Sequence, residues 1–352
     1  MLKGELGKGL DSVEALRTAL QRAIELEHAT IPAYLYALYS LGSDNAEIAE
    51  LVASVAIEEM SHFLLAANVL NAIGGAPVID RPGFIPRYPG PLPGAVGGRL
   101  VVPLAPFSLE LVENVFMAIE QPEEPPTATE PPGKGQPLTI GAFYNAIKKG
   151  IDAAGEPIFT GSRERQVTQA FFASPHVRLV EVSDVASANT AIDLILEQGE
   201  GTSHSPLDDL VPGGELAHYY RYAEIVKGHR LEPTPGSDPL WGHVGPAIPF
   251  DPSKVLPVIE NPTSAGYQAG SAARYGCDAF NYTYTSLLRV LHDTLNGSPS
   301  GLAAAIGLME SLKEQARTLV TIDSGLGGTD PATGKPIFLG AGPSFEYRPT
   351  NP

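Results

Sequence analysis

The sequence of 352 residues contains a single cysteine, Cys277. One thiol excludes a disulfide framework within the chain and a thiolate metal site, so we expect Cys277 to fill the core near the start of a helix. No apolar run approaches the ~20 residues that span a bilayer. The first five residues also lack the apolar segment of a signal peptide. We therefore expect a cytoplasmic protein without a membrane partner.

Basic residues are few relative to acidic ones. The chain has 23 Lys+Arg against 40 Asp+Glu, which gives a net charge of −17. This balance disfavours binding to nucleic acids and anionic membranes, so we expect no nucleic-acid partner. The hydrophobic content of 43% is enough for a sizeable core, in one large domain or two modest ones.

Convincing strand patterns are scarce as well, and only the segments 98–102 and 176–180 resemble short strands. Apolar periodicity instead predicts eight helices, at roughly 12–41, 45–74, 108–120, 139–154, 184–200, 214–228, 277–296 and 300–320. Long proline-rich segments connect several of them, which indicates a mainly α class with long irregular loops. We expect residues 1–230 to form a helical bundle, with 231–352 packed on it as a wrapping loop and a helical pair.

Two Glu-x-x-His motifs are the most informative feature, Glu59–His62 and Glu215–His218. Residues three apart on a helix share a face, so each pair directs a carboxylate oxygen and an imidazole nitrogen to one place. Both pairs lie on the apolar stripe of their predicted helices. An ionised carboxylate cannot be buried there unless it is paired, protonated or bound to metal.

Two further helices each carry a glutamate in an apolar row. Glu27 lies in the row of helix 12–41, and Glu200 shares the apolar face of helix 184–200, with Glu197 as an alternative on a polar face. Together with the two motifs they form the ligand set of a di-iron carboxylate bundle. The predicted metal ligands are Glu27, Glu59, His62, Glu200, Glu215 and His218. A buried Glu–His network without metal is the alternative.

Several neighbouring side chains have two interpretations. Tyr34 shares the face of Glu27 and is a candidate catalytic residue as hydrogen-bond donor or redox relay, although a core aromatic is favoured; Tyr222 is read in the same two ways. Arg221 is a candidate for a substrate carboxylate, with a salt bridge as the favoured role. Glu120 ends the helix 108–120 and could join the site, but solvent exposure is favoured. Glu58 lies four residues before His62 and could substitute for Glu59, but it lies off the stripe, so a surface position is favoured.

At this point the chain resembles a known family. The matching segments are 23–32 (AIELEHATIP), 58–62 (EEMSH), 70–75 (LNAIGG), 197–201 (EQGEG), 215–222 (ELAHYYRY), 280–284 (FNYTY) and 342–347 (GPSFEY). Together they are similar to the ferritin-like family of the iminophenyl-pyruvate dimer synthase type, which includes members of the violacein and rebeccamycin pathways. The resemblance runs from about residue 12 to residue 348. It implies a ferritin-like four-helix bundle with additional helices and long Pro-rich loops, a bound metal, and oxidative coupling of imines of aromatic 2-oxo acids.

The leading hypothesis is therefore a metal-dependent oxidoreductase that uses O₂ or peroxide on a small-molecule substrate. Iron is the expected metal, with two ions, and manganese or copper are the alternatives. We expect the loops 77–107 and 232–265 to form the wall of the substrate pocket, and the chain to form a homodimer. A non-catalytic protein that binds or stores metal is the second hypothesis, and a metal-free helper of a biosynthetic complex is the third.

Overall fold

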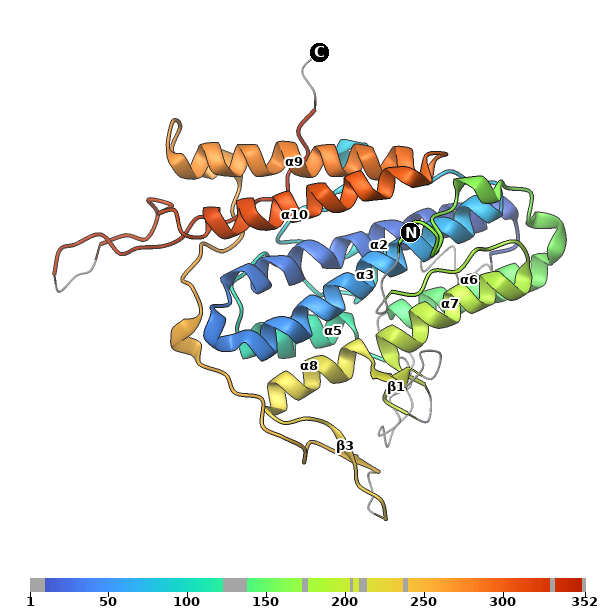
Figure 1. Ribbon diagram of the computed structural model, residues 1–352, viewed down its shortest axis with the longest axis horizontal. Coiled ribbons are helices and arrows are strands. Elements are labelled where there is room, and N and C mark those ends of the chain that lie inside the picture. The colour runs from blue at the N-terminus through green and yellow to red at the C-terminus, as the bar shows by residue number, and fades with distance from the viewer. Residues whose placement is uncertain are drawn as a thin grey trace.

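The computed structural model describes residues 10–122, 138–172, 177–202, 205–208, 214–236, 240–329 and 333–349. Its centre is a pair of long helices, α2 (Val13–Ser40) and α3 (Ala46–Ala72), joined by a short 3₁₀ turn, Ser43–Asn45. The hydroxyl of Ser12 caps α2 by accepting a hydrogen bond from the Ala15 amide at 3.1 Å. The two helices lie side by side along their length (Figure 1).

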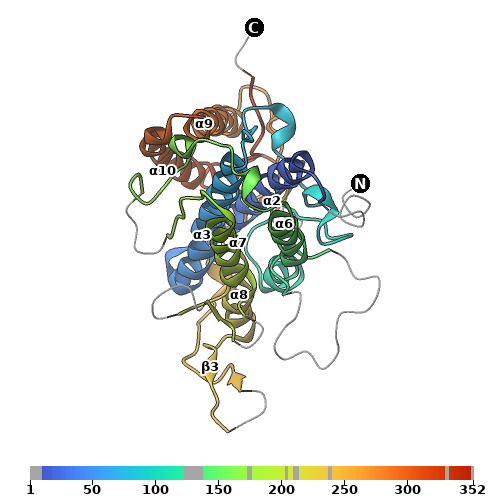
Figure 2. The ribbon, with the colours of Figure 1, turned by 90° about the vertical axis from the view of Figure 1, so that its right-hand side faces the viewer.

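Two further rods complete the bundle, and each is broken. One rod consists of α4 (Leu109–Leu111), a π-helical turn (Val112–Phe116), α5 (Met117–Ile119) and then α6 (Ile140–Ala154). The other consists of α7 (Val185–Glu200) and α8 (His218–Lys227). The helix α7 packs on α3 and α6, while α8 packs on α3 and on the π-helical turn (Figures 1 and 2). Both rods are interrupted beside the centre of α3, and these breaks leave room for polar side chains in the interior of the bundle.

A second layer covers the face of α2 that points away from these rods. It is the helical pair α9 (Ala272–Leu295) and α10 (Leu302–Leu319), seen end-on in Figure 2. Apolar residues of both helices belong to the same hydrophobic core as those of α2 and α3. Cys277 is fully buried in the second turn of α9, which confirms its expected role as core filler. The predicted division at residue 230 stays a prediction.

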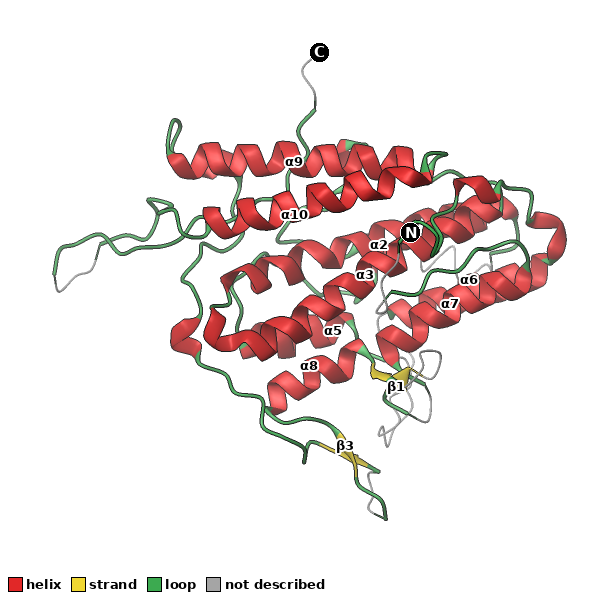
Figure 3. Ribbon diagram, viewed as in Figure 1, coloured by secondary structure: helices red, strands yellow, loops and turns green. Residues whose placement is uncertain are grey.

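Strands are minimal in the described residues (Figure 3). β1 (Leu207–Asp208) pairs with β2 (Glu215–Leu216), and β3 (Glu232–Pro233) pairs with β4 (Trp241–Gly242), both antiparallel. The segments 98–102 and 177–180 are irregular except for one bridge between Val102 and Gly90, and His176 lies outside the described residues. The mainly α class is confirmed. In the described part of the chain, no helix has the length and apolarity needed to cross a membrane.

Six of the eight predicted helices match the structure to within two residues at each end. The remaining two begin elsewhere. The last helical pair starts five residues early, at Ala272 instead of 277. The helix predicted at 214–228 starts only at His218, because residues 215–216 pair as a strand with 207–208. The prediction that Glu215 and His218 share a helix face is therefore wrong.

Candidate metal centre

Three buried side chains meet at the centre of the bundle, and they can hold a metal ion. Glu59, His62 and His218 each offer one ligand atom, and these atoms lie within 4.8 Å of one another. Glu27 and Glu120 border them: His62 Nδ1 is 3.8 Å from Glu27 Oε2, and His218 Nδ1 is 3.4 Å from Glu120 Oε2. We call these five residues the metal-site cluster. They come from α2, α3, the end of α5 and the start of α8, and each is at most 5% exposed.

The α3 pair behaves as its spacing predicts. His62 Nδ1 lies 3.9 Å from Glu59 Oε1 one helical turn away, and both side chains face the cluster. On the other side of the ring, Nε2 lies 2.9 Å from the amide oxygen of Gln198 on α7. An amide oxygen only accepts hydrogen bonds, so Nε2 carries a proton and donates it. This contact fixes the ring and directs Nδ1 toward the site where a metal would bind.

His218 provides the observation that tests whether the cluster fits a metal. Its Nδ1 atom is fully buried, 2.9 Å from Glu59 Oε1, yet it makes no hydrogen bond of acceptable geometry with any described residue. Its Nε2 atom, by contrast, lies 3.0 Å from Glu58 Oε2. A ring that is held at Nε2, and whose Nδ1 faces two carboxylates without forming a hydrogen bond, is arranged as a metal ligand with a carboxylate behind it. The residues present therefore fit a bound transition metal.

Arg221 holds the carboxylate behind His218. Its Nη1 and Nη2 atoms donate to the two oxygens of Glu58 at 2.8 and 3.1 Å, and its remaining donors contact Ser54, Glu215 and the Leu216 carbonyl. Glu58 is 3% exposed, so the expectation of a surface residue is wrong. The reason is that α3 is covered on several sides, by α2, α7 and α8. Arg221 forms the favoured salt bridge and does not line the pocket described below.

Each carboxylate of the cluster also accepts a hydrogen bond from a buried hydroxyl. Thr30 donates to Glu59 at 3.0 Å, and Tyr144 donates to Glu27 at 2.6 Å. Tyr34 donates to Glu120, and its ring is completely buried. Tyr34 is thus both a core aromatic and a hydrogen-bond donor to the cluster. These contacts leave the second oxygen of each carboxylate free to face a cation.

Burial and neighbouring charges shift the pKa values of the cluster in opposite directions. Burial raises the pKa of Glu59 to about 8, and the charge of Glu120 adds to this against the opposing effect of His218. Burial lowers the pKa of His218, but contacts with Glu120, Glu58 and Glu59 outweigh it, so this pKa lies well above its usual value. In Glu58 the effect of burial is outweighed by His218 and Arg221, which hold its pKa at about 2. The raised pKa values of Glu59 and His218 both favour the protonated forms in this cluster of buried carboxylates.

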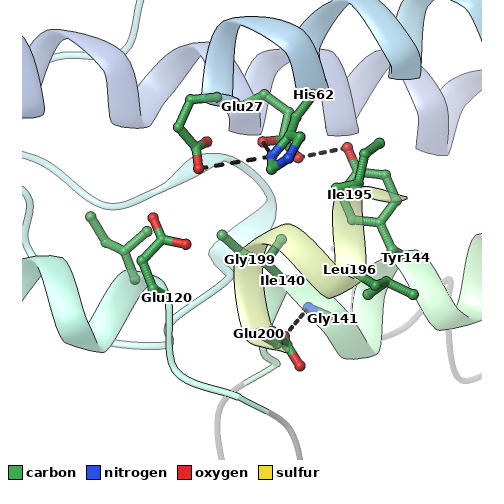
Figure 4. A pocket seen from close by; sticks show the side chains of 12 residues that line it. Glu27, His62, Glu120, Ile140, Gly141, Tyr144, Ile195, Leu196, Gly199 and Glu200 are labelled. Atoms are coloured by element: carbon green, nitrogen blue, oxygen red, sulfur yellow. Dashed lines mark hydrogen bonds and ion pairs between the residues drawn. The ribbon is translucent and has the colours of Figure 1, made fainter. Parts of the chain in front are cut away.

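Glu200 and Glu215, two of the predicted ligands, lie apart from the cluster. Glu200 Oε1 accepts a hydrogen bond from the Gly141 amide at 2.8 Å, in the first turn of α6. Figure 4 shows its carboxylate directed to Gly141, whereas Glu120 faces Glu27 and His62. Glu215 is 45% exposed in its side chain and pairs with Arg221 at 3.1 Å. The structure therefore brings together four of the six predicted ligands, Glu27, Glu59, His62 and His218. Glu120, at the end of α5, is the additional carboxylate of the cluster.

A small pocket of about 20 Å³ opens beside the cluster, between the broken ends of the two rods (Figure 4). About 10–15 Å³ of such volume holds one water molecule. Its lining residues are Glu27, Glu59, His62, Ile119, Glu120, Ile140, Gly141, Tyr144, Ile195, Leu196, Gly199 and Glu200. None of them belongs to the loops 77–107 and 232–265, so the prediction that these loops form the wall of the pocket is wrong for this pocket. The helices α6 and α7 form it instead.

Sequence reasoning missed Gln198 as part of the site, and it considered Glu120 and Glu58 but favoured exposure for both, which is wrong. Glu120 follows the last residue of α5 and is 5% exposed, because a π-helical turn precedes it and the chain ends its helix inside the bundle. Five-residue π turns often occur at functional sites, but helical periodicity cannot detect them. The acidic pair Glu58–Glu59 and the arginine three residues after His218 were the available signals for Glu58, since a buried carboxylate requires a basic partner.

Comparison with known proteins adds the following findings. The ferritin-like family model matches residues 20–227 of the chain. Over 93% of the chain, the sequence is 28% identical to dichlorochromopyrrolate synthase from Lentzea aerocolonigenes. Over 91% of the chain, it is 26% identical to 2-imino-3-(indol-3-yl)propanoate dimerase from Chromobacterium violaceum. These matches cover 35% and 33% of the two relatives, so the chain spans about a third of their length.

A solved structure supports the fold independently. A ferritin-like protein from Caulobacter vibrioides superimposes with a TM-score of 0.59, over 86% of this chain and 93% of that one. The sequence identity is 22%, so the likeness concerns the fold alone. The predicted bundle architecture is confirmed.

Proposed function

Since this chain belongs to the ferritin-like family, we propose that it is a metal-dependent oxidoreductase that couples two molecules of a 2-imino acid. The main support is the buried cluster of three carboxylates and two imidazoles, in which the Nδ1 atom of His218 has no hydrogen-bond partner. The two relatives named above are a synthase and a dimerase, and both names describe enzymes. Because the chain spans only about a third of each, the activity of this chain is a proposal of its own.

The donor atoms of the cluster indicate the class of metal. Carboxylate oxygens and imidazole nitrogens suit iron and manganese, and the described cluster contains no thiolate, the ligand that favours copper(I). Iron is our choice, with two ions, because several carboxylates can bridge neighbouring cations. Glu27, Glu59, His62, Glu120 and His218 would hold them. The bound metal would supply the electron transfer that the coupling requires.

The chemistry of coupling sets what the site must accomplish. Joining two imino acids by one new bond removes a hydrogen atom from each, which amounts to two electrons and two protons. Molecular oxygen accepts them to give hydrogen peroxide, or hydrogen peroxide accepts them to give two molecules of water. The chain's own residues contribute binding, orientation and exclusion of bulk water, since the cluster is nearly inaccessible to solvent.

The pocket offers a route for the substrate to the cluster. Ile140, Ile195 and Leu196 give it an apolar wall, which suits an aromatic side chain. Its volume of about 20 Å³ is too small for an indole ring, so the ends of α6 and α7 have to move apart during binding. The hydrogen bond between Glu200 and Gly141 joins these two ends and has to open for this movement.

The experiment begins with protein purified without chelators. Metal analysis should give close to two equivalents of iron, and incubation with the imine of indole-3-pyruvate and O₂ or peroxide should give a product of twice the substrate mass less two hydrogens. His218→Ala should abolish metal content and product together, whereas Glu215→Ala should retain metal. Metal without product would favour a binding or storage role, and protein without metal would contradict the proposal.

A further inference from the structure

The hydroxyl of Tyr222 is buried near the metal-site cluster and makes no hydrogen bond of acceptable geometry with any described residue, although the neighbouring Tyr34 hydroxyl is close enough to lower its pKa. The ring is 0% exposed, so the hydroxyl does not contact bulk solvent in this conformation. A buried donor without a partner costs about 1–3 kcal/mol of stability. Phenylalanine would fill the same space without this cost, so packing does not explain the tyrosine.

The position of Tyr222 directs it toward the cluster. It lies four residues after His218 on α8, and residues at this spacing share a helix face. Among the described residues of α8, three buried side-chain atoms make no hydrogen bond: His218 Nδ1, the Tyr220 hydroxyl and the Tyr222 hydroxyl. Tyr220 lies two residues from both of the others and therefore on a different face of the helix. The same face of one helix therefore carries an unpartnered nitrogen that suits a metal and an unpartnered donor one turn further on.

Aromatic packing fixes the ring in this position. Tyr222 meets Tyr34 edge to face at 5.5 Å between ring centroids, and it contacts Phe116 of the π-helical turn at 5.3 Å. Tyr34 in turn donates its hydroxyl proton to Glu120, so that hydroxyl is already committed as a donor. Burial raises the pKa of Tyr222 well above its usual value, and the charges of Glu120 and Glu59 raise it further against the smaller opposing effects of Tyr34 and Arg221. The hydroxyl thus keeps its proton and remains a donor at every physiological pH.

We propose that Tyr222 donates a hydrogen bond to an exogenous ligand at the metal centre, either water or a heteroatom of the substrate. This inference rests on the proposed metal-dependent function. It gives Tyr222 a role distinct from that of Tyr34. Tyr34 stabilises Glu120, a proposed ligand of the metal, whereas Tyr222 donates to the water or substrate atom that binds there.

Thermal unfolding of the metal-free protein provides the first test. Tyr222→Phe should have a Tm equal to or above that of the wild type, because removing the hydroxyl breaks no hydrogen bond. Tyr34→Phe is the matched control and should have a lower Tm, since it removes a donor from buried Glu120. A lower Tm for Tyr222→Phe would show that its hydroxyl already has a partner in the folded chain, and this would overturn the inference.

The second test measures the binding of azide to the cobalt(II)-loaded protein, with visible absorption as the signal. Tyr222→Phe should keep the cobalt content of the wild type and bind azide about 2- to 10-fold more weakly, as expected for the loss of one hydrogen bond. Unchanged azide affinity, loss of cobalt, or failure of azide to bind the wild type would each overturn the inference. Failure of the wild type to bind any metal would contradict the proposed function as well, so the two failures are distinguishable.

Discussion

Glu58 and Arg221 form a bidentate ion pair in the interior of the bundle, with contacts of 2.8 and 3.1 Å and side chains that are 4% and 6% exposed. The same carboxylate accepts a hydrogen bond from His218 Nε2 at 3.0 Å. The buried ion pair therefore also supports the imidazole of His218, a candidate metal ligand. This relationship links the stability of α8 to the orientation of the imidazole.

Removal of Arg221 alone should destabilise the protein strongly. Arg221→Leu leaves the Glu58 charge buried without its cation, and such losses cost about 3–5 kcal/mol. The double variant Glu58→Leu, Arg221→Leu removes both charges and should recover most of this loss. Urea unfolding of the metal-free proteins measures both. Equal destabilisation of the single and double variants would contradict the ion-pair account.

Removal of the Glu58 charge should weaken metal binding without removing a ligand. Glu58→Gln withdraws the carboxylate that orients His218, and changes of this kind typically lower metal affinity about 10- to 100-fold. The control is Glu25→Gln, another buried carboxylate paired with arginine, which lies outside the cluster. Competition with a chelator of known affinity gives the ratio. Similar losses in both variants would indicate a general effect of destabilisation.

The metal-site cluster should contribute less stability to the metal-free protein as the pH rises from about 4.5 to about 8. Burial raises the pKa of Glu59 to about 8, so between these values the folded chain holds a proton that the unfolded chain releases. The pKa of His218 is also raised, which acts in the same direction. This stability is complete below pH 4.5 and is lost as the pH passes 8.

Burial lowers the pKa of His28 to about 3, so this residue favours folding increasingly as the pH rises to about 6.5. Thermal unfolding between pH 6.5 and pH 8 therefore checks the dependence above that range. The Tm of the metal-free wild type should fall by several degrees, and Glu59→Gln should give a flatter profile because a neutral amide releases no proton. Metal binding requires the deprotonated carboxylate and neutral imidazole, so metal affinity should rise over the same interval. A Tm that increases with pH over this interval in metal-free wild type would be the opposite of this expectation.

The carboxylates around the cluster should separate into ligands and non-ligands. Glu59→Ala and Glu120→Ala should each reduce the metal content of the purified protein, because both side chains face the buried nitrogen of His218. Glu215→Ala should keep its metal, since that carboxylate is half exposed and pairs with Arg221. Metal content per chain, measured on freshly purified protein, decides the matter. Metal loss in Glu215→Ala alone would reverse the assignment.

Much of the fold follows from the sequence because long amphipathic helices carry a strong periodic signal. The stripe that contains Glu27 and the stripe that contains Glu59 and His62 correctly identified the inner faces of α2 and α3. The fourth-rod prediction failed at Glu215 because a Glu-x-x-His spacing has meaning only where a helix has already begun. Here a two-residue strand, 215–216, precedes His218. Its pairing with residues 207–208 depends on tertiary contacts, which cannot be predicted from the periodicity of the sequence.

The site itself was harder to predict where it depends on ends of helices. Glu120 follows the last helical residue of α5, and its burial arises from a break in the rod opposite α8. Glu58 lies next to a ligand on a helix that neighbours cover on several sides, so an off-stripe position did not mean exposure. Both cases show that a face is defined by the neighbours of a helix as well as by its own pattern.

The most direct test of the account is anomalous scattering from a crystal of the protein, recorded at the absorption edges of iron, manganese and copper. We expect metal in the space bounded by Glu27, Glu59, His62, Glu120 and His218, with His218 Nδ1 as one ligand. Metal coordinated instead by Glu200 or Glu215, or crystals of chelator-free protein in which the five side chains enclose no metal at any of these edges, would contradict it.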